Sequence, residues 1–168
     1  MLMSSLRRRL KIVMHRCYGP LTLIPFFPAT LAWRRTGGTD SARYCYSVWL
    51  RHLVKAAQQG LCSPPRTVAE LGPGDSLGIG LTALLTGTER YLALDIVEYA
   101  DMAAALPLLD ELVALVSARS PIPDDREFPE VKPPLKSYAF PSEIVTDDIL
   151  ARALDARRVE AIRSCLRT

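Results

Sequence analysis

The residues best suited to chemistry lie in one stretch, 67–95, where an acid and two glycines follow a short apolar run. Glycine has no side chain, so Gly72 and Gly74 would let a ligand approach the backbone closely. Asp95 lies 21 residues after Gly74, about the spacing at which an acid accepts hydrogen bonds from ribose hydroxyls. The carboxylate of Glu70 would repel a diphosphate and attract a cation. The stretch therefore predicts a site for a nucleoside that carries a positive charge.

The elements that must position these residues form a strand, a glycine turn, a short helix and a second strand. The first strand is expected at Val68–Leu71, and Asp75 or Ser76 is expected to cap the helix that follows it. Gly87 is placed to end that helix. Tyr91–Leu94 is continuously apolar, which predicts a parallel strand that is buried on both faces.

Two segments of this stretch resemble a known family. VAELGPGDSLG resembles motif I, and YLALD resembles motif II, of the class I S-adenosylmethionine-dependent methyltransferases. The resemblance implies an α/β fold with a Rossmann-like, doubly wound parallel sheet, and S-adenosyl-L-methionine as cofactor. It implies methyl transfer to an acceptor such as a small molecule or a glycan-like compound, with no base assigned. The implied cofactor-binding residues are Glu70, Gly72, Pro73 and Gly74 around the amino acid part, Asp95 on the ribose, Ile96 against the adenine, and Ser76 at the methionine carboxylate.

Two other functions stay open. A nicotinamide-dependent oxidoreductase would show the pattern GxGxxG, but here the third glycine, Gly78, comes one position late.

A complete fold of the methyltransferase class has seven strands, whereas this sequence predicts two, with a weak extended piece at 137–140. We therefore expect an incomplete sheet, as in a truncated N-terminal portion of such an enzyme. A non-catalytic remnant, or a cofactor-binding module whose sheet is completed by a partner chain, is the alternative.

Three helical regions are expected around this unit, within a domain spanning residues 41–168. The segment 41–60 has apolar residues at helical spacing, with Asp40 or Ser41 as its cap. Asp101 is expected to start a short turn of helix, and Pro107 is suited to the first position of the amphipathic helix that follows. The last region runs from the cap at Thr146 or Asp147 to about Leu166, with Asp155 and Ala156 dividing it in two.

Residues 121–141 contain six prolines and no sustained period, which predicts a long irregular segment. Such a segment either shapes a substrate pocket or is a surface insertion without chemistry. The acids here and at the start of the last helical region are expected to be solvated loop and cap residues. They are Asp124, Asp125, Asp147 and Asp148.

The first 40 residues form a separate basic and apolar arm. Five of the 21 basic residues fall in the first 16 positions, which leaves 16 basic against 18 acidic residues in the remainder. A slightly acidic body does not favour nucleic-acid binding. The apolar run 17–33 is short and broken by prolines, so neither a signal peptide nor a spanning helix is expected. Residues 7–35 either contact a membrane surface weakly, or pack on the domain or close over a ligand, and the second interpretation is favoured.

The four cysteines and two histidines show no metal-ligand spacing, so no metal site is expected. Cysteines that are far apart and form no CxxC pair favour a reducing, cytoplasmic location. His52 lies beside the apolar face of the 41–60 helix, and we expect a packing or surface role for it rather than a catalytic one.

Overall fold

A computed structural model describes residues 38–95 and 100–167. The chain divides into two units at residue 36, and every element below belongs to the second unit. The expectations for the arm, including membrane contact through residues 7–35, and the adenine contact of Ile96 lie outside the described residues.

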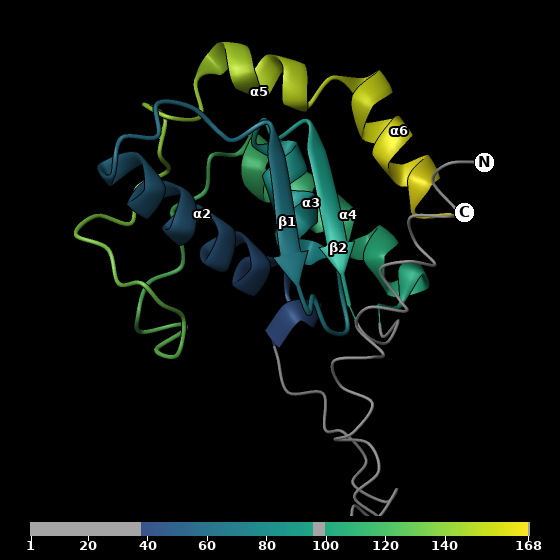
Figure 1. The fold of residues 1–168 in the computed structure, drawn as a ribbon, viewed down its shortest axis with the longest axis horizontal. Helices are drawn as coiled ribbons and strands as arrows, with labels where there is room; N and C mark the ends of the chain where they lie inside the picture. The colour runs from purple at the N-terminus through teal and green to yellow at the C-terminus, as the bar shows by residue number, and fades with distance from the viewer. Residues whose placement is uncertain (1–37, 96–99, 168) are drawn as a thin grey trace, which may run out of the picture. The chain divides into compact units, whose positions relative to one another are not determined.

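A parallel pair of strands forms the sheet, as the sequence predicts (Figure 1). Strand β1 is Thr67–Leu71 and strand β2 is Arg90–Leu94, each one residue longer than expected. The register pairs Glu70 with Ala93, and the helix α3, Gly78–Leu85, connects the two strands. The described chain is therefore a mixed α/β structure built around one β-turn-helix-β unit.

The remaining helices pack with α3 into a common core. Their bounds are a 3-10 turn η1 at Gly38–Asp40, then α2 at Ala42–Gln58, α4 at Met102–Ser117, α5 at Asp147–Ala153 and α6 at Ala156–Cys165. Leu50 and Leu53 of α2 are buried with Leu85 of α3, and Leu109 of α4 is fully buried in the same cluster. This core lies between the helices and fixes α3 against the sheet.

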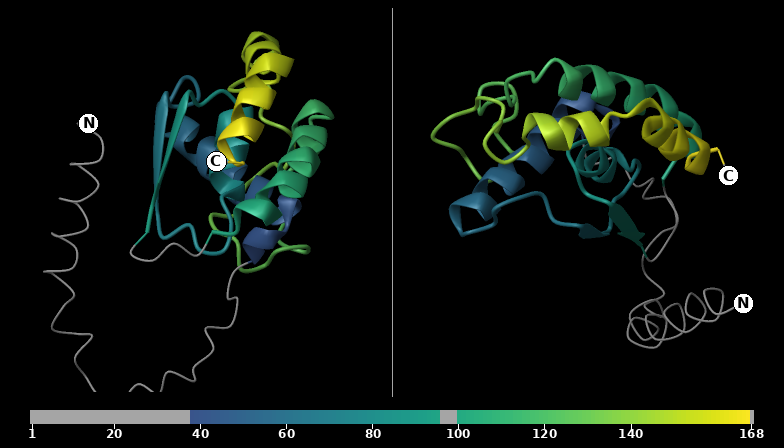
Figure 2. Two further views of the ribbon diagram at one scale, coloured as in Figure 1. Left: turned by 90° about the vertical axis from the view of Figure 1, so that its right-hand side faces the viewer. Right: turned by 90° about the horizontal axis from the view of Figure 1, so that it is seen from above.

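All described helices lie on one side of the sheet (Figure 2). The expectation that β2 is buried on both faces is wrong, because its outer face is open among the described residues. Leu71 is 80% exposed and Leu92 is 44% exposed. The described helices thus cover one face of the sheet, whereas the expected doubly wound arrangement carries helices on both faces.

Helix α4 begins earlier than the sequence predicts. Pro107 lies inside the helix, not at its first position, because α4 starts at Met102. Asp101 supplies the start signal: its Oδ1 accepts a hydrogen bond from the N–H of Ala104 at 3.3 Å. The apolar residues at 102–106 continue the helical pattern across the proline, whose side chain is exposed. Packing of α4 on α3 thus offsets the hydrogen bond that a proline cannot make.

The helix starts were predicted with mixed success. Ser41 caps α2 and Thr146 caps α5, each one of the two candidates expected. The last region divides at Asp155 as expected, and Asp155 also caps α6, which was not predicted. Helix α3 differs, because its N-cap is Leu77 and makes no side-chain hydrogen bond. Residues 118–146 contain no helix or strand, so the extended piece expected at 137–140 is not a strand. Among the residues described, no helix is long and apolar enough to cross a membrane.

Candidate functional site

The glycine turn and the two predicted acids meet at the carboxyl edge of the sheet. The N–H of Gly72 donates to the carbonyl of Leu94 at 2.8 Å, so the turn leaves β1 directly beside the end of β2. Asp95 follows Leu94 and is exposed, and Glu70 lies at the same end of the neighbouring strand. The parallel register therefore brings together residues that are 25 positions apart in the sequence.

The two turn glycines adopt backbone conformations that other residues rarely adopt. The φ angle is +69° at Gly72 and +72° at Gly74. Among the described residues, nothing lies within 4 Å of where a Cβ would stand at either glycine. The turn thus presents bare backbone to open space, as a site for close approach of a ligand requires.

Ser76 is held inside the structure. Its hydroxyl donates to the carbonyl of Thr39 in η1, accepts from the N–H of Gly78 at 3.2 Å, and is buried. The carbonyl of Asp75 accepts from the N–H of Asp101 at 3.1 Å. These bonds fasten the glycine turn to η1 and to the start of α4. The predicted contact of Ser76 with a methionine carboxylate stays a prediction.

Glu70 is the predicted site residue with the most unusual surroundings. Its side chain lies on the inner face of the sheet, and the hydroxyl of Tyr91 donates to its Oε2 at 2.6 Å. Burial raises the pKa of the Glu70 carboxyl, and the hydrogen bond from Tyr91 opposes that rise. Sequence reasoning missed Tyr91, because only the register of the two strands shows that it faces the acid.

The other glycines of the unit serve packing. A Cβ at Gly78 would lie 2.4 Å from Sγ of Cys45, and a Cβ at Gly80 would lie 2.1 Å from Cζ of Tyr91. Gly78, the third glycine of the motif, therefore allows α3 to approach α2 instead of facing a ligand.

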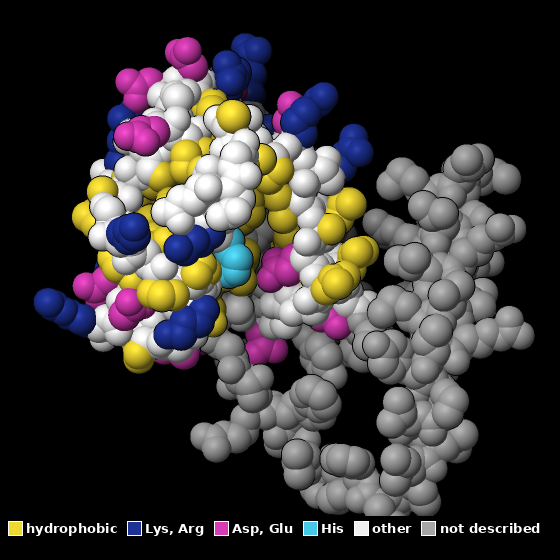
Figure 3. Space-filling view, turned by 60° about the vertical axis from the view of Figure 1, so that its left-hand side comes forward, with side chains coloured by type: hydrophobic (Ala, Val, Ile, Leu, Met, Phe, Trp, Pro, Cys, Tyr) yellow, Lys and Arg dark blue, Asp and Glu magenta, His cyan; other side chains and the backbone are white. Residues whose placement is uncertain are grey.

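His52 and Cys45 both lie on α2. His52 is exposed on α2, and its Nδ1 donates to the carbonyl of Val48 at 2.7 Å, since a carbonyl can only accept. In the space-filling view, basic, acidic and hydrophobic side chains all lie close to the histidine that is coloured cyan (Figure 3). Burial raises the pKa of the Cys45 thiol to about 12, so this cysteine stays protonated. No group of metal-ligand side chains is found in the described part of the chain.

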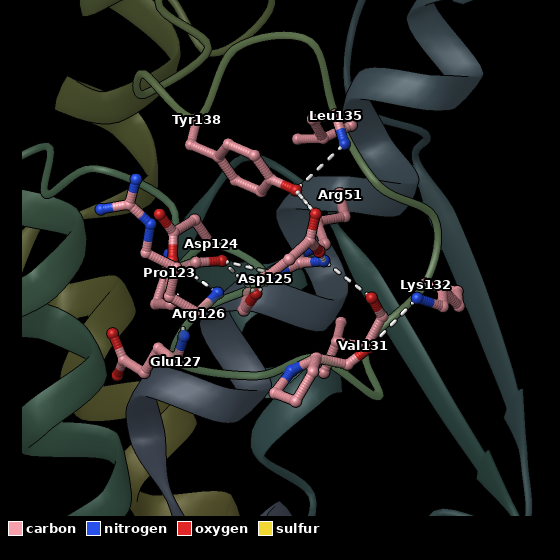
Figure 4. A network of polar contacts seen from close by, with 12 residues as sticks. Arg51, Pro123, Asp124, Asp125, Arg126, Glu127, Val131, Lys132, Leu135 and Tyr138 are labelled. Carbon is pink, nitrogen blue, oxygen red and sulfur yellow. Dashed lines mark hydrogen bonds and ion pairs between the residues drawn. The ribbon is translucent and has the colours of Figure 1, made fainter.

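A buried arginine fixes the proline-rich segment on α2, which the sequence did not predict (Figure 4). Arg51 is fully buried, and its guanidinium donates to Asp125 and to the carbonyl of Val131, each at 2.7 Å. The hydroxyl of Tyr138 donates to the same carboxylate at 2.6 Å. The centroid of the Tyr138 ring lies 5.0 Å from the guanidinium carbon of Arg51. Asp125 is thus a bonded anchor, which corrects its assignment as a solvated loop acid.

Comparisons with known proteins do not identify a family. No protein-family model matches the chain, and no match was found among curated proteins or solved structures. Any function must therefore be argued from the site itself.

Proposed function

We propose that this chain binds S-adenosylmethionine at the carboxyl edge of its sheet and serves methyl transfer to a small-molecule or glycan-like acceptor. The observation that carries the proposal is the glycine turn, whose bare backbone faces open space at the sheet edge where Glu70 and Asp95 lie. When bound, the cofactor would supply a methyl group that its sulfonium makes electrophilic.

The fit of the cofactor rests on the charges and shape of this edge. Gly72 and Gly74 would allow the amino acid part to approach the backbone, and Glu70 would attract its ammonium group. Asp95, at the end of β2, would accept hydrogen bonds from the ribose hydroxyls. No residue is assigned as a base, so the chain's contribution to catalysis is to bind and orient.

Calorimetric titration with S-adenosylhomocysteine, S-adenosylmethionine and NAD tests the proposal. Glu70→Ala and Asp95→Ala should each weaken binding of S-adenosylhomocysteine by about tenfold or more, the loss expected for one charge-assisted hydrogen bond. Glu89→Ala is the matched control, because this exposed acid lies just before β2, at the opposite end of the sheet, and pairs with Arg66. Binding of NAD alone would reject the proposal in favour of an oxidoreductase.

A second candidate is a cofactor-binding module that needs a partner chain to complete its sheet. The exposed outer-face residues Leu71 and Leu92 favour it, because apolar strand residues are ordinarily covered. Such a module would bind the cofactor and catalyse nothing alone. Tight binding of S-adenosylhomocysteine without methyl transfer to any acceptor offered would favour this candidate, and turnover by the isolated chain would exclude it.

A further inference from the structure

The Glu70 carboxylate is fixed from the neighbouring strand. Glu70 is opposite Ala93, and Tyr91 is opposite Val68, so Tyr91 is the diagonal neighbour of Glu70 on the inner face. The 2.6 Å hydrogen bond from the Tyr91 hydroxyl uses Oε2. No hydrogen bond within the described residues reaches Oε1.

The ring that carries this hydroxyl is itself fixed by α3. Three ring atoms of Tyr91 would lie 2.1 to 2.3 Å from a Cβ at Gly80, so the ring rests directly on the helix backbone. The helix that begins just after the glycine turn therefore sets the position of the hydroxyl, and through it the position of the Glu70 carboxylate.

The charges around Glu70 leave room for a cationic ligand. None of the ion pairs in the described parts of the chain involves Glu70, although its side chain is half-buried. Among the described residues, Tyr91 on β2 and Cys45 on α2 interact with it, and burial keeps both neutral by raising their pKa values. Asp95 lies at the same edge of the sheet, so the charged side chains at this edge are acidic. A half-buried carboxylate without a cation is a typical partner for a positively charged ligand.

We propose that Tyr91 is a positioning residue for Glu70: it holds one carboxylate oxygen against the sheet and leaves the other for the ammonium or sulfonium of a bound nucleoside. The identity of that ligand rests on the proposed function, whereas the positioning itself does not. Sequence motifs give no sign of this role, because it depends on the strand register and on the packing of the Tyr91 ring against Gly80.

The test uses Tyr91→Phe, which keeps the ring on Gly80 and removes only the hydroxyl. Tyr46→Phe is the matched control, because it removes another buried hydroxyl, which donates to the carbonyl of Ser120 at 2.6 Å. The first measurement follows the side-chain carboxyl carbon of Glu70 by NMR as a function of pH, without ligand. Loss of a hydrogen bond to the charged form should move the titration midpoint to higher pH in Tyr91→Phe only.

The second measurement is calorimetric binding of S-adenosylmethionine between pH 5 and 8. We expect Tyr91→Phe to weaken binding by about tenfold on the acid side and less at higher pH, because the loss of one hydrogen bond to a charged group accounts for a change of this size. An unchanged Glu70 titration overturns the positioning role, even if no ligand binds and the proposed function fails. A shifted titration with unchanged affinity at every pH overturns the link between Tyr91 and the ligand. A shift in both supports the inference.

Discussion

Arg51 in α2 and Asp125 in the proline-rich segment meet at 2.7 Å although they are 74 positions apart in the sequence. The arginine is fully buried and the aspartate side chain is 45% exposed, so the pair joins the core to the surface. The carbonyls of Pro123 and Val131 accept from the same guanidinium, each at 2.7 Å. One side chain thus organises most of an irregular segment that has no helix or strand of its own.

Replacing Arg51 should release this segment and destabilise the fold. Arg51→Met would remove the guanidinium donor from two carbonyls and one carboxylate, although Ser47 still donates to Pro123 and Tyr138 to Asp125. The loss should lower the free energy of unfolding by about 3 kcal/mol or more. Arg43→Met is the control, because Arg43 joins α2 to Glu127 of the same segment at the exposed surface. Its loss should cost less than about 1 kcal/mol. Urea denaturation measures both variants, and equal losses would contradict the role of Arg51.

The carboxylate of Asp125 should make the stability depend on pH in the acid range. The hydrogen bond from Tyr138, followed by that from Arg51, lowers the pKa of Asp125 below its ordinary 3.8. The stabilisation is therefore present above pH 3.8 and is lost as pH falls through the lower folded pKa. Asp125→Asn should show a smaller decrease in unfolding free energy between pH 5 and pH 2 than the wild type. An unchanged acid dependence would show that the network does not set this carboxyl's ionisation.

The charged form of Glu70 should lower the stability of the fold at neutral pH, although the proposed cofactor site uses this charge. Burial raises its pKa in the folded state, so the unfolded chain loses this proton at lower pH than the folded chain. Stability from this group is therefore present at acid pH and falls as pH rises through the folded pKa. Glu70→Gln should melt at a higher temperature than wild type at pH 7, with the difference vanishing near pH 4. The same variant should bind S-adenosylmethionine more weakly, and a lower melting temperature at pH 7 would contradict the expectation.

Substitution of Gly80 and of Gly74 by alanine should lower the free energy of unfolding for two different reasons. Gly80→Ala forces a Cβ into the ring of Tyr91 and should cost about 1–3 kcal/mol as overpacking. Gly74→Ala meets open space and should cost about 1–2 kcal/mol through its positive φ.

A double-mutant cycle with Tyr91→Ala separates these causes. The costs of Gly80→Ala and Tyr91→Ala should be less than additive, because removing the ring relieves the clash. Gly74→Ala and Tyr91→Ala should be additive within about 0.5 kcal/mol. Additive behaviour of the first pair, measured by urea denaturation, would show that the ring does not rest on Gly80.

The sequence by itself predicted the β-turn-helix-β unit, the caps at Ser41 and Thr146 as one of two candidates each, the division of the last helical region at Asp155, and the irregular segment 121–141. These features depend on local signals: glycine and proline punctuation, capping side chains and apolar periodicity within about 20 residues. The sequence placed a short helical turn at Asp101 and a separate helix from Pro107, whereas α4 is one continuous helix. A proline usually marks the first turn of a helix, but packing of α4 on α3 allows Pro107 inside it.

Only the tertiary structure decided which polar groups face one another. The strand register places Tyr91 on Glu70, the approach of α3 seats that ring on Gly80, and the burial of Arg51 makes Asp125 an anchor. It also decided that the outer face of β2 is open, since an apolar strand looks the same whether one face is covered or both. Contacts between residues tens of positions apart depend on how the elements pack, and local sequence patterns carry no record of that packing.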